Sequence, residues 1–218
     1  MKLVIFDVDG TLADSQGLID HAMRFAFRAA GLDPLPRERV LSIVGLSLPE
    51  AAATLLPDAD EATRAQVVQG YREAYAQARM AQAAPLYPGA VDCLDRLAVR
   101  DDLLLAVATG KSRRGLDALL AAHDLQGRFI SLQTADGHPS KPHPSMLFAA
   151  MSDAGVDPAD AVMVGDTSFD MDMARAAGMA GFGVAWGYHP VQALRDAGAA
   201  MIATDFPELT QAIERWAE

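Results

Sequence analysis

Polar residues follow four apolar runs along the chain, and their types indicate phosphoryl chemistry. The first run leads into Asp7-Val8-Asp9-Gly10-Thr11, the second into Thr109-Gly110, and the fourth into Gly165-Asp166. Lys141-Pro142 follows the third run, and Asp170 lies shortly after Asp166. Carboxylates, a hydroxyl, a backbone amide and an ammonium group are the groups that stabilise a phosphoryl group during transfer.

The acidic residues of this set predict a bound divalent cation. Up to four of them are expected to meet: Asp7, Asp9, Asp166 and Asp170. Carboxylates a few ångströms apart repel strongly in a crevice of low dielectric constant, so a proton or a cation must neutralise them. Mg²⁺ prefers such oxygen ligands, and no cluster of Cys or His indicates zinc.

Lysine is rare in this chain, which makes its positions informative. Only Lys2, Lys111 and Lys141 occur, and arginine supplies the other basic residues. Lys141 follows the end of an expected strand, opposite the acidic residues. Together with Mg²⁺ and the donors of Thr109-Gly110, it predicts a site for a phosphoryl group.

These residues need a scaffold that brings the ends of several strands together. Five apolar runs predict buried strands, over residues 2–7, 103–109, 129–134, 161–166 and, more weakly, 181–186. Apolar residues at three- and four-residue spacing predict helices over 90–99, 115–122, 145–154 and 169–177. Strands that alternate with helices predict an α/β fold with a doubly wound, Rossmann-like parallel sheet. Ligands of such sheets bind beyond the carboxyl ends of the strands.

The segment 15–85 interrupts this alternation. It carries helical patterns, most clearly over 61–80, and no strand signal. We expect it to form a small all-helical cap domain inserted into a core domain made of residues 1–14 and 86–218. A helical insert beside the strand ends can close over the crevice and exclude water.

Composition excludes several classes of protein. Against 18 Lys and Arg stand 29 Asp and Glu, a formal net charge of −11, which argues against binding to nucleic acid or to an anionic membrane. No apolar run approaches the roughly 20 residues of a membrane span. Cys93 is the only cysteine, so no intrachain disulfide forms and a cytoplasmic location is expected. We expect a monomer or a homodimer.

The motifs and their order resemble the haloacid dehalogenase-like hydrolase superfamily over essentially the whole chain. Asp7-x-Asp9-Gly10-Thr11, Thr109-Gly110, Lys141-Pro142 and Gly165-Asp166-x-x-x-Asp170 carry the resemblance. Lys141-Pro142-His143-Pro144 and Met173-Ala174-x-x-Ala177-Gly178 look like the helical-cap branch that contains phosphoglycolate phosphatases. Each motif is weak by itself, whereas the four in this order are specific.

The resemblance implies a role for each catalytic candidate. Asp7 would attack phosphorus and form an aspartyl-phosphate, and Asp9 would protonate the leaving alkoxide and then deprotonate the hydrolytic water. Thr109 and the N–H of Gly110 would hold a phosphate oxygen, and Lys141 would neutralise the nucleophile and the phosphate. An aspartate two residues after the nucleophile is typical of the branches that act on phosphate monoesters.

The resemblance also implies a magnesium site. Its ligands would be Asp7, the backbone carbonyl of Asp9, and Asp166, while Asp170 would orient the site from behind these ligands. The substrate would be a small phosphorylated metabolite, with 2-phosphoglycolate as the first candidate.

Other readings of the residues stay open. A phosphosugar mutase or a nucleotide phosphatase or pyrophosphatase could use the same scaffold, although the absence of lysine from 15–85 argues against the basic cap of a mutase. A receiver-like phosphoacceptor domain carries similar groups, but it is shorter and has no helical insert. Structurally, Asp9-Gly10 could be a simple turn, Lys141 a solvated lysine, and Asp170 a first-turn residue of a helix that Thr167 caps.

Overall fold

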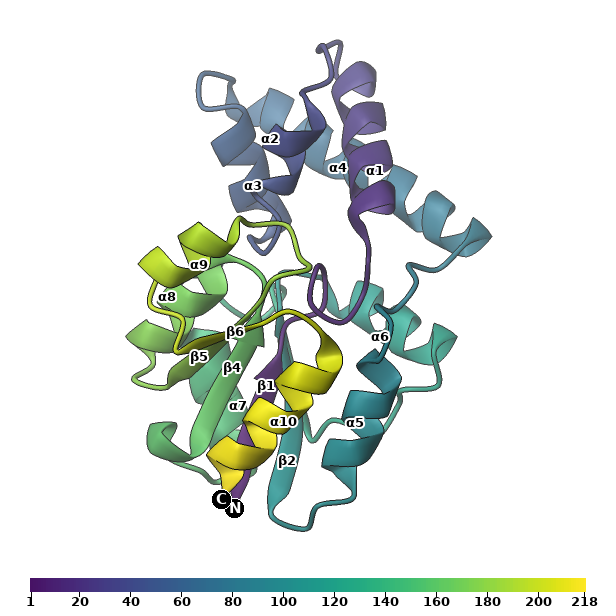
Figure 1. Ribbon diagram of the computed structural model, residues 1–218. Coiled ribbons are helices and arrows are strands. Elements are labelled where there is room, and N and C mark those ends of the chain that lie inside the picture. Colours follow the sequence, from purple (N-terminus) through teal and green to yellow (C-terminus); the bar gives the residue numbers. More distant parts are fainter.

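A six-stranded parallel sheet forms the centre of the computed structural model, which describes all 218 residues (Figure 1). The strand order is β3-β2-β1-β4-β5-β6, so the chain winds outward in both directions from β1. The strands are β1 (Lys2–Phe6), β2 (Leu103–Thr109), β3 (Ser131–Thr134), β4 (Ala161–Gly165), β5 (Ala180–Val184) and β6 (Met201–Ala203). This topology confirms the predicted doubly wound α/β fold, and β6 is a strand that the sequence patterns did not indicate.

The central strand β1 is buried on both of its faces. Val4 and Phe6 pack into one hydrophobic cluster, whereas Leu3 and Ile5 pack into another on the opposite side of the sheet. Successive side chains of a strand point to opposite faces, so a strand with helices on both faces needs an unbroken apolar run. This burial on both faces explains why β1 is an unbroken apolar run in the sequence.

Helices cover both faces of the sheet. One face of the sheet is covered by α5 (Ala90–Ala98), α6 (Arg113–Ala122) and α10 (Phe206–Ala217), which belong to the larger hydrophobic cluster. The other face is covered by α7 (Ser145–Ala154) and α8 (Ser168–Ala176), which belong to the smaller cluster. A short 3₁₀ turn over Pro158–Asp160 precedes β4, and α9 (Val191–Asp196) precedes β6. The four helices predicted in this part of the chain are present, while α9 and α10 were not predicted.

Four helices between β1 and α5 form a separate layer beyond the carboxyl ends of the strands (Figure 1). They are α1 (Gln16–Ala29), α2 (Arg37–Leu41), α3 (Leu48–Leu55) and α4 (Glu61–Ala81). These helices and the loops between them are called the cap below. The cap has its own hydrophobic cluster, which includes Met23, Phe27 and Val67. Gly70 lets α4 lie close to α1, because a Cβ there would be 3.2 Å from the Cα of Ala26.

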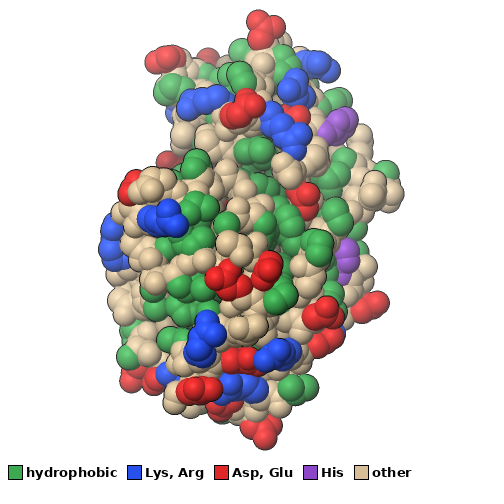
Figure 2. All heavy atoms as spheres, in the orientation of Figure 1, with side chains coloured by type: hydrophobic (Ala, Val, Ile, Leu, Met, Phe, Trp, Pro, Cys, Tyr) green, Lys and Arg blue, Asp and Glu red, His purple; other side chains and the backbone are tan.

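The surface carries charged side chains of both signs. Basic and acidic side chains are interspersed over the face that Figure 2 shows, with no continuous basic area on it. The longest helix, α4, has 21 residues, and none of the helices has the length and apolar character that a membrane crossing requires.

Candidate active site

The carboxyl ends of β1, β2 and β4 bring the candidate residues together. Asp7 follows β1, Thr109 ends β2, and Asp166 follows β4, next to β1 in the sheet. Lys141 comes from the loop before α7, and Asp170 from the first turn of α8. All five side chains are buried, although they come from distant parts of the sequence.

Three buried carboxylates form an acidic cluster. One oxygen each from Asp7, Asp166 and Asp170 lies within 4.8 Å of the others. Burial raises the pKa of Asp7 from 3.8 to about 7, an effect that the charge of Lys141 partly offsets. Burial also raises the pKa of Asp166 well above its usual value, and the neighbouring carboxylates add to this shift. Without a cation the cluster is therefore electrostatically unfavourable.

Lys141 supplies a positive charge to this cluster. Its Nζ lies 2.7 Å from Oδ1 of Asp170 and 3.1 Å from Oδ1 of Asp7. Burial acts to lower the pKa of Lys141, but the charges of Asp170 and Asp7 outweigh it and raise the pKa. Lys141 is thus a buried ammonium group that faces two carboxylates, and it is not a solvated surface lysine.

Asp166 is oriented by two donors. Oγ1 of Thr11 donates to Oδ1 at 3.0 Å, and the backbone N–H of Tyr188 donates to Oδ2 at 2.8 Å. Gly10 makes room for this carboxylate, since a Cβ at Gly10 would lie 2.2 Å from Oδ2 of Asp166. Gly10 also has a φ of +84°, a conformation that residues with a side chain rarely adopt. Asp9-Gly10 is therefore a turn and also part of the site.

Asp170 has a structural role and a place in the site. Its Oδ2 accepts hydrogen bonds from the N–H and the hydroxyl of Thr167, and its own N–H donates to Oγ1 of Thr167, which completes a capping box at the start of α8. The other oxygen, Oδ1, accepts from Lys141. The capping box at the start of α8 thus fixes the carboxylate of Asp170, which holds Lys141 in place.

The carboxylate of Asp7 has an ion pair with Lys141 but no hydrogen bond. Neither oxygen accepts a hydrogen bond, although the side chain is 1% exposed. A buried carboxylate without hydrogen bonds is strongly disfavoured unless another charge compensates for the lost water. Two further carboxylates beside these free oxygens suit a hard divalent cation such as Mg²⁺. The residues present therefore fit the expected ion.

Asp9 is outside the acidic cluster, which joins three of the four candidate carboxylates. Nζ of Lys111 lies 2.6 Å from Oδ1 and 2.8 Å from Oδ2 of Asp9, and Ser15 Oγ donates to Oδ1 as well. The Lys111 ammonium also donates to the hydroxyl of Tyr75 on α4, at 2.9 Å. The contacts with Lys111 and Ser15 explain the orientation of the Asp9 carboxylate.

Lys111 was missed as a functional candidate, although a signal for it exists. It directly follows Thr109-Gly110, and it is one of three lysines in the chain. The argument from rarity that singled out Lys141 therefore applies equally to Lys111. Burial acts to lower the pKa of Lys111, but the charge of Asp9, together with Tyr75, outweighs burial and raises it.

The cap lies directly on the candidate phosphate-binding residues. A Cβ at Gly110 would lie 2.6 Å from the carbonyl oxygen of Gly45 and 2.7 Å from that of Leu46, both in the cap. Elsewhere the N–H of Ser47 donates to Oγ of Ser140 at 2.8 Å. Only a glycine at position 110 permits this approach of the cap. Thr109 keeps its hydroxyl close by, where it accepts from the N–H of Lys111 at 3.3 Å.

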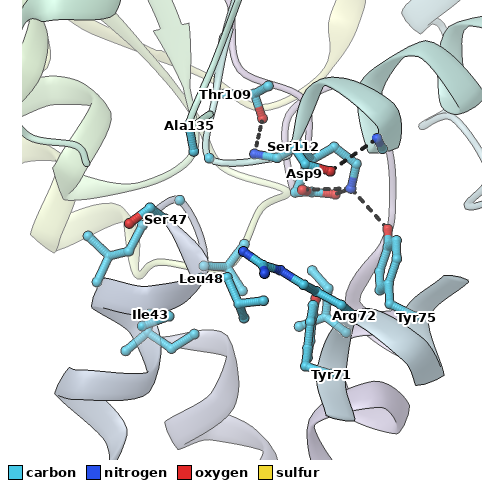
Figure 3. A pocket seen from close by; sticks show the side chains of 18 of the residues that line it. Asp9, Ile43, Ser47, Leu48, Tyr71, Arg72, Tyr75, Thr109, Ser112 and Ala135 are labelled. Carbon is cyan, nitrogen blue, oxygen red and sulfur yellow. Dashed lines mark hydrogen bonds and ion pairs between the residues drawn. The ribbon is translucent and has the colours of Figure 1, made fainter. Parts of the chain in front are cut away.

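A cavity of about 510 Å³ lies between the cap and the core (Figure 3). Asp7, Asp9, Thr109 and Gly110 line it on the core side, and residues of α1, α3 and α4 line it on the cap side. The cap arginines that line it are Arg72 and Arg79. The cavity therefore joins the candidate catalytic groups to a surface made by the cap.

An open parallel sheet with a helical insert and an acidic cluster at its strand ends defines a class of hydrolases, and comparison with known proteins identifies the family. Residues 4–184 match the family profile described as haloacid dehalogenase-like hydrolase. The chain belongs to this family. The resemblance that the four motifs predict is thereby confirmed.

Relatives in this family are named as phosphatases. A protein of Dickeya dadantii named "Probable phosphatase IndB" is 40% identical over 215 residues, which are 96% of this chain and 92% of the relative. A phosphoglycolate phosphatase of Haemophilus influenzae is 29% identical over 217 residues, covering 95% of this chain and 96% of the relative. Among solved structures, a hydrolase from Pseudomonas syringae superposes with a TM-score of 0.88 at 26% identity, covering 99% of both chains.

Proposed function

We propose that this protein is a Mg²⁺-dependent phosphatase that hydrolyses a small phosphate monoester through an aspartyl-phosphate. The single observation that carries the proposal is the state of Asp7. Its two buried oxygens accept no hydrogen bond, while Nζ of Lys141 lies 3.1 Å away. A carboxylate that is unsolvated, unbonded and next to a cationic group is prepared for attack on phosphorus.

In the proposed first step, an oxygen of Asp7 forms a bond to phosphorus while the bond from phosphorus to the alcohol oxygen breaks. Asp9 gives its proton to the departing alkoxide. The hydroxyl of Thr109 and the N–H of Gly110 hold a phosphate oxygen, and Lys141 balances the negative charge that Asp7 and the phosphoryl group bring together. The alcohol leaves with the proton of Asp9.

In the second step, water attacks phosphorus and Asp9 takes its proton, so that phosphate is released and Asp7 becomes a free carboxylate again. Nζ of Lys111, 2.6 Å from Oδ1 of Asp9, holds this carboxylate in position.

A bound Mg²⁺ would neutralise charge on the phosphoryl group during transfer. Its proposed ligands are Asp7, Asp166 and the backbone carbonyl of Asp9, and Asp170 would act by holding Lys141 and the turn that starts at Thr167. The raised pKa values of Asp7 and Asp166 support this assignment, because a cation would remove the repulsion that contributes to them.

The division into domains follows the same proposal. Residues 15–85 would form a cap domain that admits and selects the substrate, and residues 1–14 and 86–218 a core domain that performs the chemistry. We place the enzyme in the cytoplasm, in line with its single, buried and unpaired cysteine, Cys93.

Phosphate hydrolysis is favoured over phosphosugar isomerisation by the cap side of the cavity. A mutase must hold a second phosphate while the intermediate turns round, and this requires several basic groups. The cap contributes two arginines to the cavity, and Nη1 of Arg79 already donates to the carbonyl of Arg114. A nucleotide phosphatase is a second member of the same reaction class, and a nucleoside monophosphate among the tested substrates would identify it.

The test is release of inorganic phosphate from a panel of phosphorylated metabolites, with Mg²⁺ and with a chelator. We expect turnover with Mg²⁺, none in the chelator, and none by Asp7→Asn, which is nearly isosteric. An independent readout is thermal stability, since Mg²⁺ that binds the folded state should raise the Tm of the parent more than that of Asp7→Asn. Equal phosphate release by the parent and Asp7→Asn would overturn the proposal.

A further inference from the structure

We infer that the substrate is a phosphate monoester whose alcohol carries an apolar ring and, beyond the ring, an anionic group. This inference rests on the proposed phosphatase function and narrows its substrate class. It departs from the expectation of 2-phosphoglycolate. Three features of the cavity carry it: its size, the apolar wall on the cap side, and an arginine without a partner.

The cavity is larger than an alcohol as small as glycolate requires. It measures about 510 Å³. Pockets that enclose ligands of drug size measure roughly 300–1,000 Å³. With the phosphate seated between Asp7 and Gly110, the alcohol would face the lining residues of the cap. A glycolate group would leave that space filled with water.

The wall on the cap side is apolar. Ile19 and Met23 of α1 line the cavity together with Ile43 and Val44, and all four belong to the hydrophobic cluster of the cap. All four are at most 6% exposed, so packing within the cluster keeps them in place and the wall is a preformed surface. An apolar group of the substrate that packs on this wall would itself leave water, which stabilises the complex by roughly 25 cal/mol for each Å² of its apolar surface.

Aromatic rings continue this wall along α4. Tyr71 and Tyr75 both line the cavity, and their rings stack with centroids 5.6 Å apart and an angle of 20° between their planes. Aromatic side chains favour ring-shaped partners, in stacked or edge-to-face contact. A ring on the alcohol therefore fits this part of the cavity better than a flexible polyol, whose hydroxyls would lose hydrogen bonds to water.

Arg72 adds a positive charge in the same space. Figure 3 shows its side chain extending from α4 into the cavity toward Leu48, with no hydrogen bond or ion pair drawn to it. Arg79, two turns of helix further on, donates to the carbonyl of Arg114. An unpaired guanidinium that points into a substrate cavity is suited to a carboxylate or a similar anion. Because Lys141 and the core side hold the phosphate, this anion belongs to the other end of the substrate.

The test uses synthetic monoesters with leaving alcohols of similar acidity, so that differences report binding. The probes are ethyl phosphate, benzyl phosphate, 4-carboxybenzyl phosphate and the neutral 4-carbamoylbenzyl phosphate, together with 2-phosphoglycolate. We expect kcat/KM for benzyl phosphate to exceed that for ethyl phosphate at least about tenfold, from burial of the ring. We also expect the carboxyl compound to exceed the carbamoyl compound by about tenfold.

Arg72→Gln tests the anion site. We expect this variant to bring the ratio between the carboxyl and carbamoyl compounds close to one. The matched control is Arg39→Gln, because Arg39 is also an exposed cap arginine but does not line the cavity. The control should keep the ratio of the parent.

The outcomes separate this inference from the proposed function. Release of phosphate from any of these probes, or from the activated ester 4-nitrophenyl phosphate, reports the chemistry, and its absence from all of them would contradict the phosphatase. If that ester is hydrolysed but ethyl phosphate or 2-phosphoglycolate equals or exceeds benzyl phosphate, the apolar-ring inference is wrong. An unchanged ratio in Arg72→Gln would remove the anionic group from the inference.

Discussion

Nζ of Lys111 lies 2.6 Å and 2.8 Å from the two carboxylate oxygens of Asp9, and 2.9 Å from the hydroxyl of Tyr75. One ammonium group thus connects the proposed acid–base residue of the core to the longest helix of the cap. The contact is nearly buried, so solvent screens it little. The state of the cap and the orientation of Asp9 are therefore coupled through Lys111.

Lys111→Met should lower kcat/KM by up to about 100-fold, because Asp9 loses the partner that positions it and such misplacement is costly for proton transfer. Steady-state phosphate release measures the effect. The matched control is Lys2→Met, since Nζ of Lys2 contacts the carbonyl of Trp216 at the opposite end of β1. Full activity of Lys111→Met would show that Asp9 needs no such partner.

Tyr75→Phe should weaken the contact between the cap and the core, because it removes a hydrogen bond to a charged group. We expect KM to rise up to about tenfold, with a smaller change in kcat. Tyr87→Phe is the control, since the buried hydroxyl of Tyr87 has no hydrogen-bond partner and its loss should change neither parameter. Equal KM and kcat values for Tyr75→Phe and Tyr87→Phe would reject the coupling between the cap and Asp9.

Gly110→Ala should displace the cap from the core. The added Cβ would lie 2.6 Å and 2.7 Å from two carbonyl oxygens of the cap, at Gly45 and Leu46, and backbone atoms cannot yield as a flexible side chain does. We expect a loss of kcat/KM of at least about tenfold, through misplaced phosphate-binding groups. Limited proteolysis of the segment between the cap and the core should be faster than in the parent.

The control for this variant is Gly17→Ala. Gly17 lies in α1 and has open space around the position of a Cβ, so the change should leave activity and proteolysis as in the parent. If Gly110→Ala kept the activity and the proteolytic pattern of the parent, the close approach of the cap would be refuted.

The pH dependence of stability should reveal the buried charge of Asp7. Its pKa is raised from 3.8 to about 7 on folding, mainly by burial. The group therefore contributes stability that is fully present below about pH 4 and is lost as the pH rises through about 7. In metal-free protein, the free energy of unfolding of the parent should fall relative to that of Asp7→Asn over this range, by a few kcal/mol at roughly 1.4 kcal/mol for each pH unit.

Urea unfolding in a chelator at several pH values measures this difference. Asp101→Asn, at an exposed carboxylate, should follow the parent. Saturating Mg²⁺ should remove most of the difference, because a bound cation compensates for the charge of Asp7. Parallel pH profiles of the parent and Asp7→Asn in the chelator would contradict the raised pKa.

The sequence by itself determined the helices and strands that a local pattern of residues specifies. A strand buried on both faces must be a continuous apolar run, so β1, β2 and β4 were predictable, and the polar residues at their ends had to meet at one edge of the sheet. Short elements gave weaker signals. The strand β6 has three residues, and its pairing with β5 depends on the strand beside it more than on its own pattern.

Only the tertiary structure decided which groups touch in the site. Lys111 and Asp9 are 102 positions apart, and no spacing rule relates them. Tyr75 follows a helical pattern that predicts burial in the cap, but the contact of its hydroxyl depends on how the cap lies over the strand ends. The orientation of Asp9, the cover over Gly110 and the shape of the cavity all follow from that placement, because each is made by atoms of both the cap and the core.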